Sequence, residues 1–525
     1  MKFNEKSTRT AATTNYMCGK AFQLSPEMEL YTATVTSFVD NSYYEKANAR
    51  IERIRACIAQ VAPEFVAKLA IYAREEMNLR SISLVLLIEL ARVHRGDDLV
   101  ARTVMRVVKR ADELTEVLAY FQAAEGRTGT KRLNKMPKQL QKGLAAAMNK
   151  FDEYQFAKYD RKTEVRLRDV LFLTHPKAKD ENQQAVFDKL AKGDLATPYT
   201  WETEISALGQ RTFSNEAEKQ KAMASAWEEL VTSGKMGYMA TLRNLRNIIM
   251  KGSGKALESA LKQLTQPEMV RKSKQLPFRF LSAYNEIAKL TAGDDAVFEG
   301  EKKKVKKALE ALANATEIAA ANIPAVPGRT LILTDNSGSM RGDMGGSSAV
   351  SAMSKRNSAD IANLFSVMYW TQAEDTMVGL FGDRVLMPKL DRKKNIFENF
   401  EQVHKVGGQC GGATERGIFD MMEKLIREKI IVDQIIIFSD CQIGTGCLWY
   451  DHNGNKGADF DKLFKAYRRI NPDVLTYSID LRGYGNTLFS EGVVTLAGWS
   501  EKLFDLIAAF GNGVSAVEYI QNIEI

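Results

Sequence analysis

The sequence is poor in several features that mark large classes of protein. Its five cysteines, among 525 residues, are odd in number and lack the paired spacings of a disulfide framework or a zinc knuckle. No apolar run approaches the roughly 18 residues that a membrane helix needs, and the N-terminus contains no apolar signal segment. We therefore expect a protein of a reducing compartment, the cytoplasm, without a membrane span.

The composition is that of a folded chain, with 45% hydrophobic and 26% charged residues. The net charge of +8 is unevenly distributed. Residues 1–329 hold 53 Lys and Arg against 40 Asp and Glu, whereas residues 330–525 hold 20 against 25. A basic first part joined to a mildly acidic second part suggests two functions, although chance and solubility explain such a division equally well.

Residues 29–325 have the pattern of one helix after another. Apolar side chains such as Ile51 and Ile54 recur at helical spacing, and residues 81–90 are apolar enough for a buried helix. Many short helices with short connections favour helix pairs stacked into a HEAT-like solenoid; an irregular helical domain is the alternative. Further helices are expected at 112–124, 137–150, 215–231, 238–250, 254–265, 278–291 and 300–320.

The pattern changes after a segment rich in proline and glycine, residues 321–328. Short apolar strands then alternate with helices, which predicts a parallel sheet covered on both faces. We therefore expect a multidomain chain, α followed by α/β, with an N-terminal arm over 1–28, a helical domain over 29–325 and an α/β domain over 330–525. Its strands are expected at 330–334, 377–381, 434–438 and 474–479, and its helices at 349–370, 414–429, 462–469 and 501–510.

The most informative string is TLILTDNSGSM, in which a buried strand ends in a polar loop. Asp335, Ser337 and Ser339 stand at alternate positions of this loop, and ligands of open α/β sheets lie beyond the carboxyl ends of the strands. Two more loops leave the same edge and bring Thr414 and Asp440. These oxygen donors suit a hard divalent cation, Mg²⁺ above all, with one coordination position left open.

This D-x-S-x-S pattern, with a downstream threonine and a strand-terminal aspartate, resembles the metal-ion-dependent adhesion site of von Willebrand factor A domains. The resemblance implies that a partner's carboxylate fills the open position, so that the metal bridges two molecules and catalyses nothing. The alternative is that Asp335 and the serines only cap the following helix. No nucleophile–base pair accompanies the motif, so we expect no enzymatic activity.

Two basic stretches lie in the helical part. Residues 127–142 contain six Lys and Arg and no acid, and residues 158–179 contain seven more and a histidine. Cations that bind phosphates and planar side chains that stack on unpaired bases are what a folded RNA needs. Each stretch alone fits a solvated helix surface, but two so close together favour an anionic partner. The candidates in the first stretch are Arg127, Lys131, Arg132, Lys135 and Lys138.

A helical-repeat part followed by an A domain is an unusual pairing, and from about residue 25 the chain resembles the TROVE family, named for telomerase, Ro and vault particles. The resemblance implies a monomeric ring of HEAT-like repeats closed by the A domain. It implies a small noncoding Y RNA on the outer surface and the single-stranded 3′ end of misfolded noncoding RNA in the central hole. It also implies a scaffold or gate in RNA quality control, with an exoribonuclease as partner.

The Y RNA segment of that family matches KYDRKTEVRLRDVLFLTH in this chain. By this resemblance Lys158, Lys162 and Arg168 fall at basic positions, and His175 falls where the family has a histidine needed for Y RNA contact. Phe172 departs from the pattern, since a Ro-type member has an arginine there. The rival hypothesis is a metal-dependent protein-binding A-domain module carried on a helical solenoid; a metal-dependent hydrolase is poorly supported.

Overall fold

A computed structural model of the chain falls into two compact units by packing. The sheet unit comprises Met1–Ser25, Asp40–Ala47 and Glu204–Ala516, and the helical unit comprises Pro26–Val39, Asn48–Thr203 and Val517–Ile525. The sequence instead placed a boundary near residue 325. The residues that the structure describes are 12–37, 44–127, 135–291, 299–321, 323, 328–342, 348–350, 355–414, 416–445, 459–500, 502–510 and 515–525.

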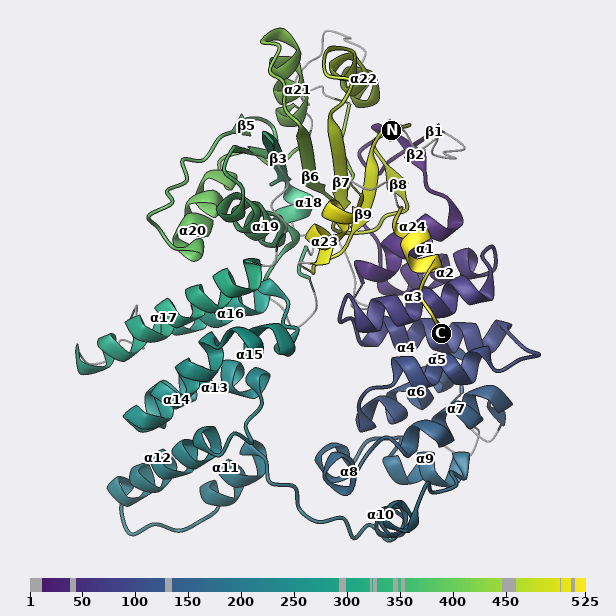
Figure 1. The fold of residues 1–525 in the computed structure, drawn as a ribbon, viewed down its shortest axis with the longest axis vertical. Coiled ribbons are helices and arrows are strands. Elements are labelled where there is room, and N and C mark those ends of the chain that lie inside the picture. The colour runs from purple at the N-terminus through teal and green to yellow at the C-terminus, as the bar shows by residue number, and fades with distance from the viewer. Residues whose placement is uncertain are drawn as a thin grey trace. The chain divides into compact units, whose positions relative to one another are not determined.

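The helical unit is built from short helices joined by short loops (Figure 1). α3 (Pro63–Glu75) begins at Pro63, whose missing N–H has no partner to lose at that position. α4 (Ser81–Val93) is buried from Ile82 to Ala91 without interruption, as its apolar sequence predicts. The other helices are α1 (Pro26–Val35), α2 (Ala47–Ile58), α5 (Leu99–Val107), α6 (Ala111–Ala124), α7 (Lys138–Met148), α8 (Glu153–Tyr159), α9 (Leu167–Thr174), α10 (Glu181–Lys192) and α24 (Ala516–Gln521).

These helices pack in the manner of a solenoid. α3, α5 and α7 pack in turn against one another, and α4 packs against α6, so that two layers form. Contacts of α3 with α4 and of α6 with α7 join the layers, and α9 packs on both α6 and α7. The stacked helix pairs expected from the sequence are therefore present in this unit, while the closed ring stays a prediction of the family resemblance.

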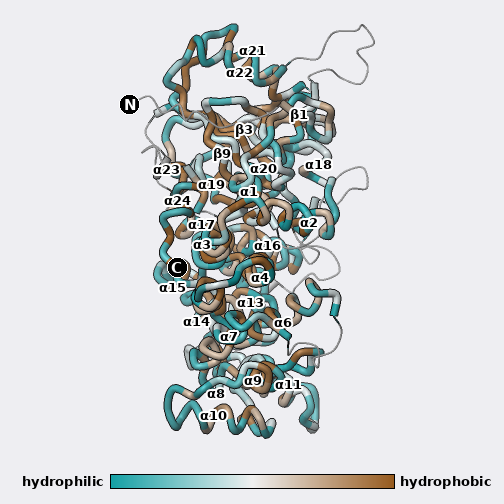
Figure 2. The backbone as a smooth tube through the Cα atoms, turned by 90° about the vertical axis from the view of Figure 1, so that its right-hand side faces the viewer, coloured by the Kyte–Doolittle hydropathy of each residue, from teal (hydrophilic) through white to brown (hydrophobic). Residues whose placement is uncertain are grey.

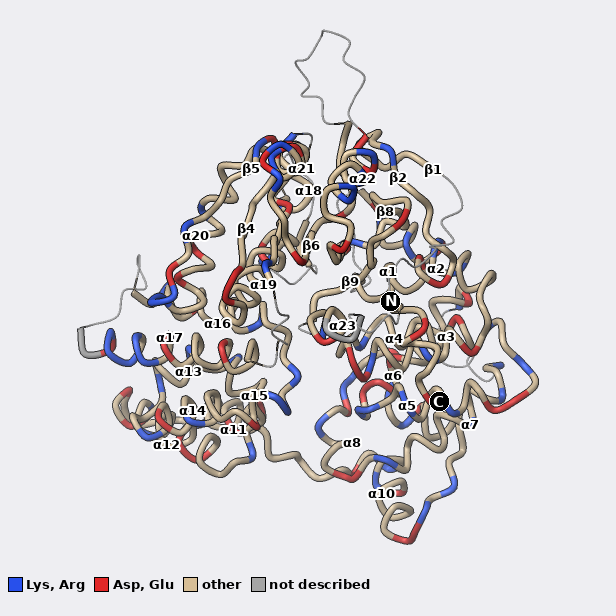
Figure 3. The backbone as a smooth tube through the Cα atoms, turned by 45° about the horizontal axis from the view of Figure 1, so that its top comes forward, with Lys and Arg blue, Asp and Glu red and all other residues tan. Residues whose placement is uncertain are grey.

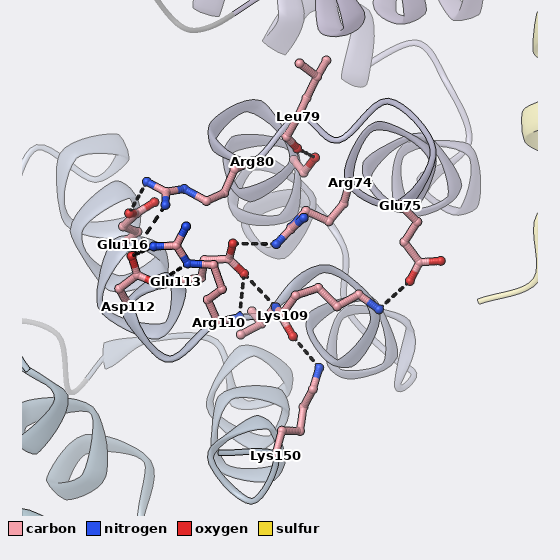
Figure 4. Close-up of polar contacts among 12 residues, drawn as sticks. Arg74, Glu75, Leu79, Arg80, Lys109, Arg110, Asp112, Glu113, Glu116 and Lys150 are labelled. Atoms are coloured by element: carbon pink, nitrogen blue, oxygen red, sulfur yellow. Dashed lines mark hydrogen bonds and ion pairs between the residues drawn. The ribbon is translucent and has the colours of Figure 1, made fainter. Parts of the chain in front are cut away.

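A buried carboxylate links α3 to α6 (Figure 4). Glu113 is fully buried, and its Oε1 accepts a hydrogen bond from Nη2 of Arg74 at 2.7 Å. Its Oε2 accepts the backbone N–H groups of Lys109 at 2.7 Å and of Arg110 at 3.1 Å. Glu113 therefore caps the N-terminus of α6, where the helix dipole favours negative charge, and pairs the two helices.

Neighbouring charges of the helical unit are paired in the same way (Figure 4). Burial opposes ionisation of Glu75, but hydrogen bonds from Arg106 at 2.8 Å and Lys109 at 2.7 Å prevail and lower its pKa to about 2. Arg80 pairs with Glu116 at 2.8 Å. Cationic side chains in this part of the unit therefore neutralise carboxylates of adjacent helices.

The end of the chain packs in the helical unit, although the sequence assigned it to the α/β domain. The ring of Tyr519 on α24 lies edge-on to Tyr72, with centroids 5.9 Å apart. Lys68 donates to the backbone oxygen of Gln521 at 2.6 Å. α24 is too short for its apolar spacing to show which surface it covers.

Of the helices that lead to the larger sheet, five were predicted from the sequence to within a few residues, whereas those at 201–209 and 267–273 were missed. The tube is blue near the start of α17 in Figure 3, where Lys304 pairs with Glu301 at 3.1 Å. The lysines there are Lys302, Lys303, Lys304, Lys306 and Lys307. The helices are α11 (Trp201–Gly209), α12 (Glu216–Thr232), α13 (Tyr238–Lys251), α14 (Gly254–Thr265), α15 (Pro267–Ser273), α16 (Pro277–Ala288) and α17 (Glu299–Ala320).

A sheet with the strand order β5–β4–β3–β6–β7–β9 follows. Its strands are parallel except for the edge pair β5–β4, and their apolar residues are brown in Figure 2. The strands are β3 (Thr330–Asp335), β4 (Thr376–Phe381), β5 (Val385–Leu386), β6 (Gln434–Ser439), β7 (Leu475–Asp480) and β9 (Val494–Ala497).

Helices cover both faces of this sheet, as the sequence predicts. On one face, Leu331 and Ile435 share a buried cluster with residues of α21 (Gly417–Arg427) and α22 (Phe460–Ile470). On the other, Phe365 of α19 (Ser358–Gln372) packs against Phe438 of β6, with centroids 5.9 Å apart, and against Phe504 of α23 (Lys502–Phe510).

Two predicted helices begin later than expected. The helix predicted over 349–370 begins at Ser358, because Asn357 caps it by accepting the N–H of Asp360 at 2.8 Å. Ala349 is instead bridged to Asn357. The helix predicted over 414–429 begins at Gly417 in α21, which leaves Thr414 in the preceding loop.

The N-terminal arm and several short elements escaped sequence prediction. β1 (Ala12–Thr14) and β2 (Lys20–Gln23) form an antiparallel hairpin, and β2 pairs with β8 (Asn486–Thr487). α20 (Ile396–Gly407) and α18 (Gly338–Arg341) were also missed. Strands of two to four residues are too short for their alternation to stand out from loops.

Candidate metal centre and nucleic-acid interface

The predicted metal ligands meet at one edge of the larger sheet. β3 lies between β4 and β6 in the sheet. The chain passes from β3 to β4 on one side of it, and it later places β6 on the other side. Ligands of open α/β sheets bind at such a switch point, beyond the carboxyl ends of the strands. Asp335 ends β3 and Asp440 follows β6, so both carboxylates lie at this point.

The first loop holds its oxygens in a tight arrangement. Asp335 Oδ1 accepts the N–H of Ser337 at 3.0 Å, and the hydroxyls of Ser337 and Ser339 lie 3.2 Å apart. Ser337 is the residue before α18, but its side chain makes no capping hydrogen bond. The helix-capping interpretation of this serine is therefore wrong.

The other two loops complete the group. Asp440 Oδ1 accepts the N–H of Gln442 at 3.0 Å, and Thr414 Oγ1 donates to the backbone oxygen of Gln442, also at 3.0 Å. Gly338 N–H donates to the backbone oxygen of Gly412 at 2.7 Å and ties the first loop to that of Thr414. The structure thus brings the predicted residues together, each at most 5% exposed: Asp335, Ser337, Ser339, Thr414 and Asp440.

The electrostatics of this group fit a divalent cation. Burial, and then the nearby charge of Asp440, raise the pKa of Asp335. Burial also raises the pKa of Asp440, against the effect of the Ser339 hydroxyl. Asp440 Oδ2 is buried and accepts no hydrogen bond from the part of the chain that the structure describes. Two buried carboxylates with an unsatisfied oxygen are costly without a compensating positive charge.

The donor set also explains which cation suits the site. It consists of carboxylate and hydroxyl oxygens, the hard ligands that Mg²⁺ prefers. Within the described ranges, no three or more His, Cys, Asp and Glu side chains cluster in a way that could hold a metal. A soft, nitrogen- or sulfur-rich site of the zinc type therefore finds no support there.

Sequence reasoning missed a serine that orients the first carboxylate. Ser439 Oγ donates to Asp335 Oδ2 at 2.7 Å. The register pairs Thr334 with Phe438, which places Asp335 beside Ser439. The serine directly before Asp440 was the available signal, but its contact depends on strand register, which a single sequence does not supply.

The N-terminal hairpin docks on the loop that follows Asp440. The Asn15 side chain donates to the backbone oxygen of Ile443 at 2.8 Å, and Tyr16 N–H donates to Gln442 Oε1 at 2.8 Å. Gly19 lies against the same loop so closely that a Cβ there would overlap the Ile443 oxygen. The hairpin therefore holds in place the loop whose Gln442 contacts both Asp440 and Thr414.

The second basic stretch forms an exposed surface on α8, α9 and the loop between them. Among the residues that the structure describes, none of its long cationic side chains forms an ion pair. Burial raises the pKa of Asp160 nearby, and the charges of Arg166 and Arg168 oppose that shift without contact. We call the following exposed residues the α8–α9 surface: Lys158, Lys162, Arg166, Arg168, Phe172 and His175.

The contrast with the arginines earlier in the helical unit is sharp. Most of those arginines lie close to a carboxylate, usually on a neighbouring helix, whereas Arg95 is exposed and donates to backbone oxygens. A paired guanidinium is already neutralised, whereas an unpaired one is available to a phosphate. The pairs are Arg53–Glu29, Arg55–Glu89, Arg74–Glu113, Arg80–Glu116, Arg92–Glu125, Arg102–Asp98, Arg106–Glu75 and Arg110–Asp112.

Helix packing brings part of the first basic stretch to the same surface. Gln141 of α7 donates to the backbone oxygen of Leu173 in α9 at 2.8 Å, and Lys138 donates to Gln141 at 3.2 Å. Lys135 and Lys138 are exposed. Arg127, in contrast, pairs with Glu125 at 3.1 Å and packs on Phe121. The predicted Lys131 and Arg132 lie outside the described residues.

His175 ends α9 in an exposed position. Its backbone is left-handed, with φ 49° and ψ 58°, and its N–H donates to the Leu171 oxygen at 3.0 Å. Glycine is the usual residue at such a position. The turn directs the chain away from the helix at Pro176 and leaves the imidazole at the end of the α8–α9 surface.

Comparison with known proteins identifies the family. The TROVE domain matches residues 15–204 and 192–326 of this chain. The chain belongs to the TROVE family. Members of this family are RNA-binding ribonucleoprotein components, as the sequence resemblance implies.

Relatives with TROVE-type sequences are much longer. The mouse telomerase protein component 1 is 27% identical over 342 residues, which cover 51% of this chain but 13% of that protein. The rat protein is 26% identical over 328 residues, 47% of this chain and 12% of its own length. The chain therefore spans only a small part of these curated relatives.

The fold has a solved counterpart. The crystal structure of the Deinococcus radiodurans RO (RSR) protein matches with a TM-score of 0.57 over 93% of this chain and 100% of that chain. At 15% identity the match shows a common fold and nothing about individual residues. Helices long and apolar enough to cross a membrane do not occur in the described ranges.

Proposed function

We propose that this chain is an RNA-binding scaffold that takes a small structured, Y-type RNA on the α8–α9 surface. Single-stranded 3′ ends of misfolded RNA are its second substrate in RNA quality control, where an exoribonuclease would act on them. The cations of the α8–α9 surface, which form no ion pair within the described residues, are the observation that carries this proposal, because most earlier arginines of the helical unit pair with carboxylates. Family membership supports it.

Filter binding of a Y-type stem–loop RNA tests this assignment. Lys158→Ala and His175→Ala should weaken binding without unfolding the protein, because both side chains are exposed. Lys306→Ala is the matched control, since Lys306 is 81% exposed on the charged surface of α17. Loss of Lys158 should also reduce the salt dependence of binding by about one released counterion. Unchanged affinity of both variants would refute the site.

The preference for single-stranded ends needs its own comparison. A duplex RNA with a 3′ single-stranded tail should bind more tightly than the same duplex with blunt ends, at one fixed salt concentration. Equal affinities would contradict the proposed recognition of 3′ ends while leaving the stem–loop assignment standing.

We further propose that the metal centre of the sheet unit holds Mg²⁺ through Asp335, Ser337, Ser339, Thr414 and Asp440. When bound, the cation supplies a positive charge between the two carboxylates and a coordination position for an oxygen ligand. The protein's own part is to keep Asp335 oriented through Ser439 and to hold the Asp440 loop through the N-terminal hairpin. A carboxylate of a protein partner is the ligand expected from the resemblance to adhesion sites.

Asp335→Ala distinguishes this metal-dependent binding from RNA binding. The substitution should abolish Mg²⁺ binding in calorimetry and leave the affinity for stem–loop RNA unchanged, because Asp335 is buried in the sheet unit. If Asp335→Ala instead removes RNA binding while the protein stays folded, the metal-dependent module is the better description of the chain.

A further inference from the structure

We propose that Phe172 is a stacking platform for an unpaired base of single-stranded RNA, with Arg168 and His175 contacting the backbone on either side of that base. This inference rests on the proposed RNA-binding function and names the kind of RNA segment that the α8–α9 surface recognises. It predicts preference for single-stranded or bulged nucleotides at this position over continuous duplex.

The exposure of Phe172 is the first observation. Its side chain is 54% exposed, and no other phenylalanine in the described part of the chain is classed as exposed. Single exposed apolar side chains are common on proteins, so exposure alone has no weight. A phenyl ring, however, has no hydroxyl that water could hydrate, so its exposure is unfavourable. The side chains near Phe172 on α9 suggest a use for this ring.

The helix places the ring within a row of RNA-binding groups. Arg168 and Phe172 are four residues apart on α9, the spacing of neighbours on one side of a helix, and His175 follows in the left-handed turn at the helix end. All three are exposed. The opposite side of α9 carries the buried residues Leu167, Val170, Leu171 and Thr174. The ring therefore lies one helical turn from a guanidinium on the solvent side, and an exposed imidazole follows at the helix end.

The ring of Phe172 is also available. Within the described residues it takes part in no ring–ring or cation–π contact. Tyr154, the other exposed aromatic residue nearby in sequence, has Nζ of Lys158 5.7 Å from its ring centroid and donates its hydroxyl to the Tyr199 oxygen at 3.4 Å. Phe172 is therefore the exposed phenyl ring of this surface, without a ring or cation contact among the described residues.

Single-stranded RNA is the ligand that matches this combination. Bases of a duplex are stacked on one another, whereas an unpaired base offers its face to an aromatic ring and its phosphates to adjacent cations. The cations around Phe172 are unpaired within the described chain, which favours a polyanion over an apolar protein surface. Every base has a face that can stack, so the platform should tolerate any sequence, with a modest preference for purines because their larger rings stack more strongly.

Binding of an oligoadenylate strand, and of the blunt duplex that it forms with oligouridylate, tests this proposal. Phe172→Ala should lower affinity for the single strand roughly 5- to 150-fold, the range of one lost base–aromatic stack. Affinity for the blunt duplex should stay unchanged. Phe172→Leu should behave like Phe172→Ala, because leucine is apolar but not planar, and Phe172→Trp should restore affinity.

Three further measurements separate stacking from other roles. Phe172→Ala should leave the salt dependence unchanged, whereas Arg168→Ala should reduce its slope for single strands by about 0.7. Fluorescence of 2-aminopurine in the strand should be quenched by the wild type and less by Phe172→Ala. Ile431→Ala, which removes an apolar side chain that is 49% exposed in the sheet unit, is the matched control and should have no effect.

The outcomes distinguish this inference from the proposed function. If Phe172→Ala binds oligoadenylate like the wild type while Arg168→Ala binds more weakly, the platform is refuted and RNA binding stands. Equal losses for single strand and duplex would also refute stacking. If the wild type binds neither oligoadenylate nor stem–loop RNA, the proposed function itself fails.

Discussion

Replacement of the buried carboxylate that joins α3 to α6 should destabilise the helical unit strongly. Glu113→Ala leaves Arg74, whose side chain is 15% exposed, as a buried cation without this partner. It also removes the acceptor of two backbone N–H groups at the start of α6. Breaking a buried ion pair by removing one partner costs about 3–5 kcal/mol, and we expect the opening free energy of the helical unit to fall by an amount in that range.

Two further variants serve as comparisons: one keeps the shape of the side chain but removes its charge, and the other breaks an exposed ion pair. Glu113→Gln keeps an oxygen for one N–H group but no charge for Arg74, so its cost should be smaller, about 1–3 kcal/mol. Glu64→Ala breaks the pair of Glu64 with Lys68, 3.0 Å apart, in which the glutamate is 65% exposed. Exposed pairs of this spacing contribute about 0.3–0.5 kcal/mol, so this variant should be nearly neutral.

Hydrogen exchange of backbone amides is the suitable assay, because the chain has two compact units and a single global free energy is not defined for it. Amides of α3 to α7 should exchange faster in Glu113→Ala, while those of the larger sheet keep their protection. If the amides of α3 to α7 were equally protected from exchange in Glu113→Ala and Glu64→Ala, the buried ion pair would not stabilise the helical unit as its geometry implies.

The remaining predictions concern the hairpin, the surface pair and the metal centre. Gly19→Ala should loosen β1 and β2 by overpacking against Ile443, at a cost of about 1–3 kcal/mol of local stability. Faster exchange of the backbone amides of these strands would show the loss. Gly237→Ala is the control and should cause no such loss, because the space around Gly237 is open. Folding lowers the pKa of Glu75 from 4.5 to about 2, so its ionised form stabilises the folded protein above pH 4.5. Glu75→Gln should therefore reduce the stability of the helical unit by about 1–2 kcal/mol above pH 4.5. In unfolding experiments this difference should vanish as the pH falls towards 2. Asp440→Asn should raise the melting temperature in chelator and abolish the further rise that Mg²⁺ gives the wild type, and a rise that survives the substitution would contradict the site.

The metal centre could be predicted from sequence because it depends on features that a sequence displays. A buried parallel strand is a short apolar run, and the residue that ends it lies at the ligand edge of the sheet. Asp335 and Asp440 follow such runs directly. Thr414 and the two serines follow from loop patterns, and all five are together in the structure. Ser439 was missed because its contact with Asp335 depends on the pairing of β3 with β6.

The helices of the helical part could be predicted from the sequence, but the division of the chain into two compact units could not. The 3.6-residue period located most helices to within a few residues. It could not show that α24, near the end of the chain, packs on α3, since that contact joins segments more than 400 residues apart. The strands of the N-terminal hairpin were missed because they are too short to show a clear alternation, and because their partners, β8 and the 441–443 loop, are equally remote.

The excess of basic residues in the first part of the chain indicates a binding surface only where the cations form no ion pair with neighbouring carboxylates. A count of charges treats Arg74 and Arg168 alike, yet Arg74 is paired with a buried carboxylate and Arg168 is exposed and unpaired within the described chain. Only the second kind can exchange its counterions for phosphates and thereby gain free energy from the release of salt. A candidate RNA surface is therefore located by cations that form no ion pair around an exposed aromatic ring. A count of cations alone would have pointed as readily to α5, whose Arg102 and Arg106 are both paired with carboxylates.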